Sequence, residues 1–152
     1  MSNLFSLEGK VVLITGASRG IGKAIATMLV AQGAKVAGTA TSESGAANIS
    51  DYLGDNGKGY ALNVTDPASI EATLAAIKAD LGDIDVLVNN AGITRDNLLM
   101  RMKEAEWDDI IDTNLSSIFR LSKAVLRPMM KKKNGRIINI GSVVGTMGNA
   151  GQ

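Results

Sequence analysis

The feature that most constrains the fold of this chain is the segment TGASRGIG at residues 15–22, which joins an apolar run to a stretch of helical periodicity. The run Val11–Ile14 is typical of a buried strand, and the apolar spacing that follows predicts a helix from about Gly20 to Ala31. Glycine allows positive φ and lets a ligand approach the backbone closely. The free N–H groups and the positive dipole end of the helix favour an anion. The segment therefore predicts a turn that binds the phosphates of a nucleotide.

Strand-like apolar runs alternate with helix-like segments along the chain, which is the pattern of βαβ units on a parallel sheet. The length of 152 residues fits one domain. The predicted strands are residues 10–15, 35–40, 60–64, 84–89 and 136–140. We therefore expect a single Rossmann-type α/β domain, with a doubly wound parallel sheet of about five strands.

Several residues predict where the later helices and turns begin and end. Asp66 and Pro67 predict a helix start, because Asp is a good N-cap and Pro suits the first helical position. A long helical stretch is expected from about 103 to 133, with Pro128 kinking it or ending its regular part. The glycines at 54, 57 and 59 are interpreted as a turn before the third strand.

The apolar residues of the first helix predict which of its faces packs on the sheet. Ile21, Ile25 and Met28 or Leu29 recur at helical spacing and should all face the sheet.

Two residue types that the chain lacks exclude several chemistries. The absence of cysteine excludes disulfides and thiolate catalysis, and the absence of histidine removes the usual general base and the commonest metal ligand. A Ser-His-Asp hydrolase is therefore excluded for this chain alone, and we expect no metal site. A formal charge of +1 gives no argument for nucleic acid. No apolar run approaches the ~18 residues of a membrane helix, and the first residues do not resemble a secretory signal, so a cytoplasmic location is expected.

Small and amide residues stand at four of the predicted strand ends. These are Gly16, Asn63, the run NNAG at 89–92, and the pair Gly141 and Ser142. In doubly wound sheets, ligands bind outside the carboxyl ends of the strands. Each residue alone is an ordinary turn residue. Four such ends on one edge favour a ligand crevice.

These motifs together resemble the short-chain dehydrogenases/reductases. The resemblance rests on TGxxxGxG at 15–22, NNAG at 89–92, a helix asparagine at Asn114 and a strand-end serine at Ser142. It covers essentially the whole chain. Within the family, RDNLLMRM at 95–102 and GSVVG at 141–145 are similar to bacterial members that reduce 3-oxoacyl groups on acyl carrier protein in fatty-acid synthesis. The resemblance implies that activity, and a homotetramer for the intact protein.

The resemblance also implies roles for individual residues. Ser142 would hydrogen-bond the substrate carbonyl, and Asn114 would hold a water in a proton relay. Asn63 and Val64 would lie by the adenine, and Asn90 by the adenosine ribose. Without the resemblance, Ser142 would be interpreted as a turn serine and Asn114 as a polar residue on a helix surface. The implied cofactor-binding residues are Gly16, Ser18, Arg19, Gly20, Ile21, Gly22, Thr41, Asn63, Val64, Asn90, Ala91 and Gly92.

One part of the family pattern is missing. The family acid is the tyrosine of YxxxK, expected shortly after the strand-end serine, but residues 143–152 contain neither tyrosine nor lysine. Tyr52 and Tyr60 lie in the wrong half of the chain. We therefore expect this chain to be incomplete relative to the family and inactive alone, with residues 136–140 as an exposed edge strand. The alternatives are a reductase of another ketone or alcohol, and a non-catalytic nucleotide-binding piece.

The preferred nicotinamide cofactor is predicted from the second strand end. An NAD site usually has an acidic residue there for the ribose 2′-hydroxyl. Here residues 38–42 contain none, and the first acid is Glu43. Arg19 in the glycine turn could instead bind a 2′-phosphate through charge-assisted hydrogen bonds. The sequence therefore favours NADP(H), although Arg19 could also be a solvated loop residue.

A basic cluster, Lys131, Lys132, Lys133 and Arg136, follows the long helical stretch. On sequence alone, the better interpretation is a solvated helix end, where cations suit the dipole. The family resemblance adds a second interpretation, the docking of an acidic acyl carrier protein by electrostatic steering.

Overall fold

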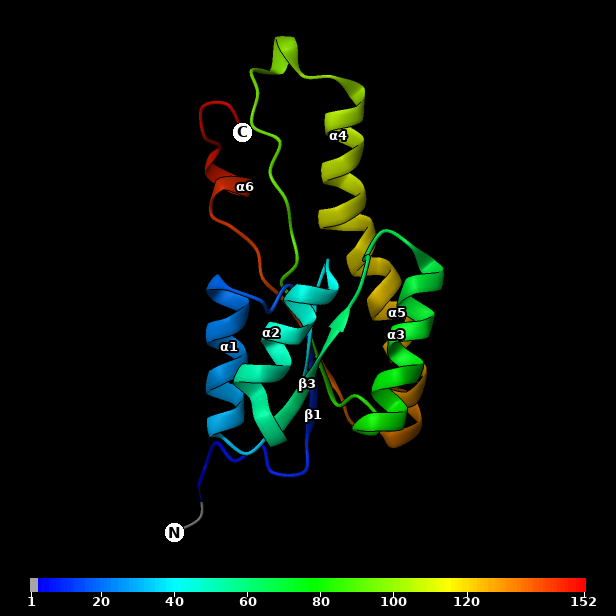
Figure 1. Ribbon diagram of the computed structural model, residues 1–152. Helices are drawn as coiled ribbons and strands as arrows, with labels where there is room; N and C mark the ends of the chain where they lie inside the picture. The colour runs from blue at the N-terminus through cyan, green and yellow to red at the C-terminus, as the bar shows by residue number, and fades with distance from the viewer. Residues whose placement is uncertain (1–2) are drawn as a thin grey trace.

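A computed structural model describes residues 3–152 (Figure 1). Its centre is a five-stranded parallel sheet in the order β3-β2-β1-β4-β5. The strands are β1 (Val11–Ile14), β2 (Lys35–Ala40), β3 (Gly57–Ala61), β4 (Val86–Asn89) and β5 (Arg136–Asn139). The order reverses between β1 and β4, which confirms the predicted doubly wound fold.

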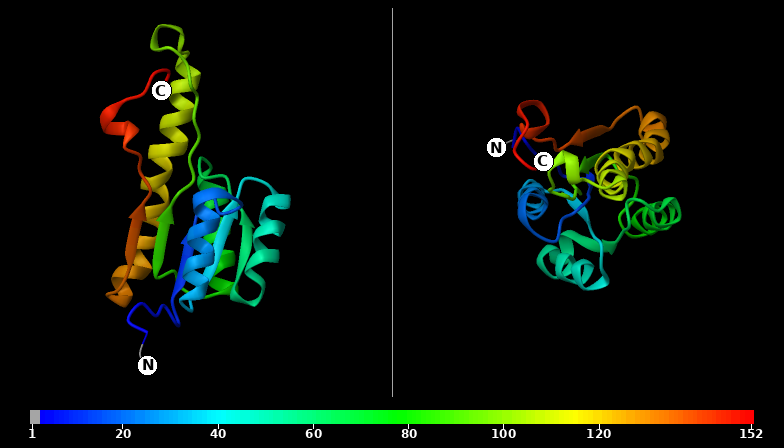
Figure 2. Two further views of the ribbon diagram at one scale, coloured as in Figure 1. Left: turned by 90° about the vertical axis from the view of Figure 1, so that its left-hand side faces the viewer. Right: turned by 90° about the horizontal axis from the view of Figure 1, so that it is seen from above.

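Helices cover both faces of this sheet (Figure 2). α1 and α2 pack on one face, and α3 and α5 pack on the other. The helices are α1 (Gly20–Ala31), α2 (Glu43–Leu53), α3 (Pro67–Asp80), α4 (Glu104–Ile111), α5 (Ser117–Lys132) and α6 (Val144–Met147). Short turns are η1 (Gly54–Asn56), η2 (Leu99–Arg101) and the π-helical turn η3 (Asp112–Ser116). None of the helices described over residues 3–152 has the length and apolar character needed to cross a bilayer.

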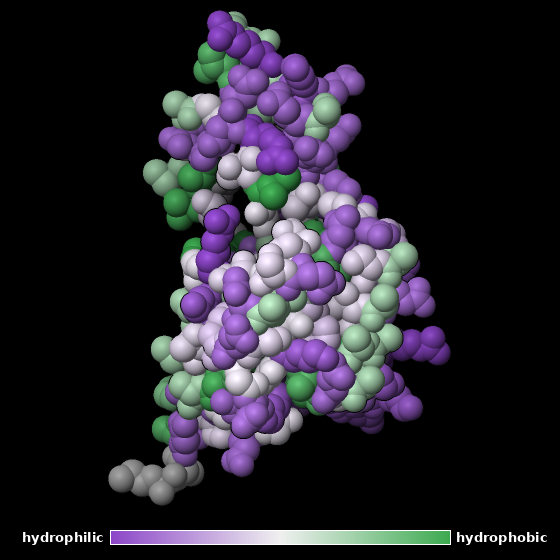
Figure 3. Space-filling view, in the orientation of Figure 1, coloured by the Kyte–Doolittle hydropathy of each residue, from purple (hydrophilic) through white to green (hydrophobic). Residues whose placement is uncertain are grey.

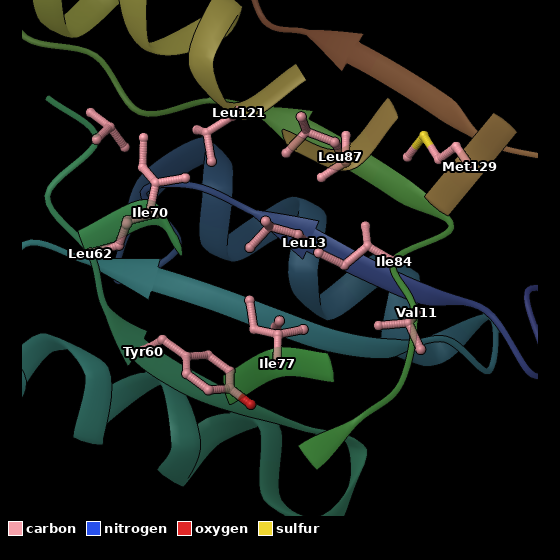
Figure 4. Close-up of a cluster of buried hydrophobic side chains, with 13 residues drawn as sticks. Val11, Leu13, Tyr60, Leu62, Ile70, Ile77, Ile84, Leu87, Leu121 and Met129 are labelled. Carbon is pink, nitrogen blue, oxygen red and sulfur yellow. The ribbon is translucent and has the colours of Figure 1, made fainter. Parts of the chain in front are cut away.

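The strands divide the buried side chains between two cores. Leu13 of β1 and Leu87 of β4 point toward α3 and α5, in the core that Figure 4 shows. Ile14 and Val88 point the other way, toward α1 and α2. All four side chains are at most 2% exposed, and each buried side chain of this size contributes roughly 1.5–3 kcal/mol. Burial on both faces explains why the central strands are continuously apolar.

The third strand begins earlier than predicted, at Gly57 rather than at residue 60. Gly57 and Gly59 lie within β3 and are not turn residues. Their lack of a side chain lets neighbouring backbone come close to the strand. A Cβ atom on Gly59 would collide with the carbonyl of Ala46 in α2. The Gly59 N–H donates to Ser50 Oγ of the same helix (2.9 Å). α2 therefore covers the outer edge of β3.

The opposite edge of the sheet is formed by β5 and is more open. Ile138 is 47% exposed and Ile140 is 37% exposed. This agrees with the expectation of an exposed apolar edge strand.

The first helix packs on the sheet through only part of the face predicted for it. Ile25 and Leu29 pack against the core, as expected. Ile21 and Met28 are instead 64% and 62% exposed. The buried residues of α1 are Gly22 and Ala26, whose small size lets the helix lie close to the sheet. Exposed apolar side chains are visible in Figure 3 along the side of the molecule where α1 lies.

The long helical stretch is two helices joined by the π-helical turn, rather than one helix. Pro128 neither ends nor interrupts α5, which continues to Lys132 and stops at Lys133, a residue with φ of 53°. α4 projects beyond the sheet beside residues 90–103 and 141–152 (Figures 1 and 2). We call these three segments the arm. The Asn97 N–H donates to the Gly151 carbonyl (2.9 Å) and joins two of them.

Candidate cofactor and active site

The glycine-rich turn is fastened to the end of β4 by Thr15, the last residue before the turn. Its hydroxyl oxygen accepts two backbone hydrogen bonds, from the N–H groups of Asn90 (3.0 Å) and Ala91 (2.9 Å). Thr15 is only 1% exposed, so water cannot replace these contacts. A single hydroxyl therefore holds two strand ends in register.

The first and last glycines of the turn are required by its geometry. Gly16 has φ of +68°, and a Cβ atom there would lie 3.1 Å from the Cα atom of Ala91. A Cβ atom on Gly22 would collide with the Gly16 carbonyl and lie 2.6 Å from Asn90 Nδ2. The start of α1 is therefore pressed against the turn.

Asn90 holds this turn through its side-chain amide. Its Nδ2 donates to the carbonyls of Thr15 (3.1 Å) and Gly16 (3.0 Å). These two bonds use both amide hydrogens. Only Asn90 Oδ1 is left for the ribose that the family resemblance places beside it.

The outer side of the turn presents unused hydrogen-bond donors. Among residues 3–152, the N–H groups of Ser18, Arg19 and Gly20 have no acceptor, and no side chain caps α1. Arg19 is exposed and forms no ion pair within the described part of the chain. Free N–H groups at a helix start and an unpaired guanidinium are suited to bind phosphate.

The end of β2 supports the turn from the neighbouring strand. Thr39 Oγ1 accepts from the Gly16 N–H (3.3 Å), and the Thr39 carbonyl accepts from the Ala17 N–H (2.8 Å). Thr41 is exposed at the strand end, and Ser42 caps α2 by accepting from the Gly45 N–H (3.1 Å). A Cβ atom on Gly45 would lie 3.9 Å from Ser18 Cβ, so the start of α2 borders the turn.

The segment after β3 is built around Asn63. Its Oδ1 accepts from the N–H (3.0 Å) and the hydroxyl (2.7 Å) of Thr65, which closes a local turn. Val64 is 8% exposed, and its side chain belongs to the core beneath α3. An adenine at this position would therefore meet the Val64 backbone and the Asn63 Nδ2 group.

Ser142 and Asn114 line one cavity of about 520 Å³ that lies between the segments of the arm. Ser142 is exposed, and its Oγ accepts from the Val144 N–H (3.2 Å). Asn114 clamps the loop after β4: its Oδ1 accepts from the Ile93 N–H, and its Nδ2 donates to the Ile93 carbonyl, both at 2.8 Å. The structure thus brings together the two residues to which the family resemblance assigns catalysis.

Tyr52 is a contact of the turn that the sequence analysis did not identify. Its hydroxyl donates to the Ala17 carbonyl (2.7 Å) from the last turn of α2. Burial raises the pKa of Tyr52, so its hydroxyl stays protonated at neutral pH. No local signal marks this role, because the two residues are 35 positions apart.

The basic cluster at the end of α5 is not uniformly free. Lys132 Nζ donates to Asp85 Oδ1 (2.6 Å), and Asp85 also accepts from the Val11 N–H (2.9 Å). Burial alone would raise the pKa of Asp85, but these two hydrogen bonds hold it below its usual value. Lys131 and Lys133 are exposed and remain available to a partner.

A glycine turn and asparagines together at the carboxyl ends of parallel strands are the arrangement expected of a dinucleotide-binding oxidoreductase domain. The model of the short chain dehydrogenase family matches residues 10–152, and this chain belongs to that family.

Curated relatives share most of this sequence. The chain is 77% identical to the 3-oxoacyl-[acyl-carrier-protein] reductase FabG of Salmonella typhimurium over 147 residues, which is 97% of this chain and 60% of that protein. It is 78% identical to the protein of that name from Vibrio cholerae and 74% identical to that from Escherichia coli, with the same coverage. The chain thus spans about 60% of the length of these curated relatives.

Proposed function

We propose that the whole protein reduces 3-oxoacyl groups on acyl carrier protein to 3-hydroxyacyl groups in fatty-acid synthesis, with NADPH as reductant. The observation that carries this proposal is 74–78% identity to reductases of that name over 97% of this chain. The placement of Ser142 and Asn114 in one cavity supports it. Because the chain spans about 60% of those relatives, the activity is proposed for the whole protein.

The residues present fit a nicotinamide dinucleotide. The unpaired N–H groups of the glycine turn would hold its phosphates. Because Gly22 has no Cβ atom, the start of α1 can lie against this turn. The segment at Asn63 and Val64 would receive the adenine, and residues 90–92 would border the adjoining ribose. When bound, the cofactor supplies the hydride.

The choice of NADP(H) over NAD(H) rests on Arg19. The end of β2 carries the neutral residues Thr41 and Ser42, and the first acid, Glu43, lies in the first turn of α2. No carboxylate therefore stands at the strand end to repel a 2′-phosphate. An exposed arginine without an acidic partner in residues 3–152 would bind that phosphate.

Ser142 is suited to polarise the substrate carbonyl. The Val144 N–H occupies one lone pair of its oxygen, which leaves the hydroxyl hydrogen free to donate. Asn114 uses one amide hydrogen and one oxygen lone pair in its bonds to Ile93. Its second amide hydrogen and second lone pair would hold the relay water. The acid that protonates the substrate oxygen would be the family tyrosine, which this chain does not contain. We therefore expect this chain alone to bind the cofactor without turnover.

The acidic carrier protein would dock on Lys131, Lys133 and Arg136, because the ammonium group of Lys132 is held by Asp85. Reversing the charge of Lys131 and Lys133 together should slow turnover of a carrier-linked substrate and spare a small thioester analogue. Equal losses on both substrates would refute docking at this cluster. A homotetrameric assembly, as the family resemblance implies, belongs to the same proposal.

The test of the proposed function is NADPH oxidation by the whole protein with acetoacetyl-acyl carrier protein or with a simple ketone, together with NADP+ reduction with the matching alcohol. Oxidation with the carrier-linked substrate is expected. Preference for another ketone or alcohol would favour a different short-chain reductase. Binding of NADPH without its oxidation by either carbonyl compound, and without NADP+ reduction by the alcohol, would favour a non-catalytic nucleotide-binding protein.

A further inference from the structure

The backbone of Ala17 is held on both sides of its Cα atom, through the N–H of one peptide and the carbonyl of the next. The Ala17 N–H donates to the Thr39 carbonyl of β2 (2.8 Å), and the Ala17 carbonyl accepts from the Tyr52 hydroxyl of α2 (2.7 Å). Ala17 has no exposed surface. The backbone at the first bend of the glycine turn is therefore fixed by two different elements.

Fixing the Ala17 carbonyl also fixes the direction of the Ser18 N–H, since both belong to one peptide plane. In a trans peptide the C=O and N–H groups point in opposite directions. The Ser18 N–H therefore points away from Tyr52, and it has no acceptor within residues 3–152. A hydrogen bond to the carbonyl also polarises the peptide and strengthens its N–H as a donor.

Tyr52 is itself held in place. Its ring packs against the core beneath α1 and α2, and Lys23 Nζ lies 4.9 Å from the ring centroid. A cation at this distance over a tyrosine ring is attracted to its face. The hydroxyl is thus presented to the turn by a side chain with little freedom to move.

We propose that Tyr52 is a positioning residue for cofactor binding, which directs the Ser18 N–H at a phosphate of the bound dinucleotide by holding the Ala17 carbonyl. This inference rests on the proposed function for the identity of the ligand. It adds a residue of α2 to a site otherwise formed by strand ends and the start of α1.

The test compares Tyr52→Phe with Tyr60→Phe. Both substitutions remove one phenolic hydroxyl that donates one hydrogen bond, to Ala17 (2.7 Å) or to Asp80 (2.9 Å). Tyr60 belongs to the core on the opposite face of the sheet, so Tyr60→Phe controls for the loss of a hydroxyl.

We expect Tyr52→Phe to weaken NADPH binding in calorimetry by about two- to ten-fold, the factor that one hydrogen bond supplies. It should leave binding of adenosine 2′-monophosphate unchanged, because that ligand lacks the pyrophosphate and its 2′-phosphate is assigned to the Arg19 side chain. The Ser18 amide resonance of the ligand-free variant should shift, because its peptide loses the polarising hydrogen bond. Tyr60→Phe should change none of these quantities.

The outcomes separate this inference from the proposed function. If the unmodified protein binds NADPH and the two variants behave alike, Tyr52 has no positioning role and the proposed function stands. If the unmodified protein does not bind NADPH, both are overturned. Should Tyr52→Phe fail to fold, the unmodified protein provides the test: the Ser18 amide resonance must shift when NADPH is added, and no shift overturns the inference.

Discussion

Thr15→Val tests whether one buried hydroxyl holds the glycine turn to β4. Valine keeps the shape of threonine but cannot accept the hydrogen bonds from Asn90 and Ala91. A buried donor without a partner costs about 1–3 kcal/mol. The N–H groups of Asn90 and Ala91 would lose their acceptor, and both residues are half-buried. At about 1–2 kcal/mol for each, the free energy of unfolding should fall by about 2–4 kcal/mol. Thr15→Ser keeps the hydroxyl, loses one methyl group, and should cost about 1 kcal/mol.

The assay is urea unfolding of the unmodified protein and both variants, followed by calorimetric titration with NADPH. Thr15→Val should lower the midpoint without changing the slope, because the same surface is exposed on unfolding. It should also weaken NADPH binding more than Thr15→Ser does, since the turn loses its attachment to residues 90 and 91. Equal destabilisation by the two variants, or none by Thr15→Val, would refute the reasoning.

Three further outcomes follow from contacts of the site and of β4. Gly22→Ala should weaken NADPH binding by about ten-fold in the same titration, because its Cβ atom would displace the Gly16 carbonyl. Asp85→Ala should lower the free energy of unfolding by about 2–4 kcal/mol, while Asp83→Ala, which removes an exposed pair at 3.7 Å, should change it by less than about 1 kcal/mol. Since the folded-state pKa of Asp85 is lowered, its contribution is complete above the unfolded value of about 3.9 and is lost as pH falls through the folded value. The stability difference between the unmodified protein and Asp85→Asn, measured by urea unfolding, should therefore narrow below about pH 4.

Local patterns were sufficient where one segment determines its own conformation. Asp66 caps α3 as predicted, with Oδ1 accepting from the Ala68 N–H (3.0 Å), and Pro67 begins the helix. The apolar runs of β1 and β4 are buried on both faces, as their composition indicated. The five-stranded parallel fold was therefore predictable.

Features that depend on packing between distant segments were not predictable in the same way. Gly57 and Gly59 look like turn residues in sequence, but a Cβ atom would collide with the Val36 carbonyl of β2 at Gly57 and with the Ala46 carbonyl of α2 at Gly59. The positions of Ile21 and Met28 follow helical spacing, yet the small residues of α1 determine which face approaches the sheet. The π-helical turn at residues 112–116 likewise has no clear signal in the spacing of apolar residues.

The site shows the same division. Motif spacing predicted the turn and the strand-end residues, and the structure places Asn114 and Ser142 on one cavity. The hydrogen bonds that fix the backbone of the glycine turn come from residues far away in sequence. Asn90 bonds to carbonyls 74 and 75 positions earlier, and Tyr52 bonds to a carbonyl 35 positions earlier. Such hydrogen-bond partners cannot be predicted from local sequence, because they come together only in the folded sheet.

The most direct measurement is calorimetric titration of the protein with NADPH and with NADH, repeated on Arg19→Ala. NADPH should bind the unmodified protein at least about ten-fold more tightly than NADH, since charge-assisted hydrogen bonds to the 2′-phosphate contribute about 1.5–3 kcal/mol. Arg19→Ala should remove most of this difference and leave NADH binding nearly unchanged. Equal losses for the two cofactors, or no binding of either to the unmodified protein, would contradict an NADPH site at the glycine turn.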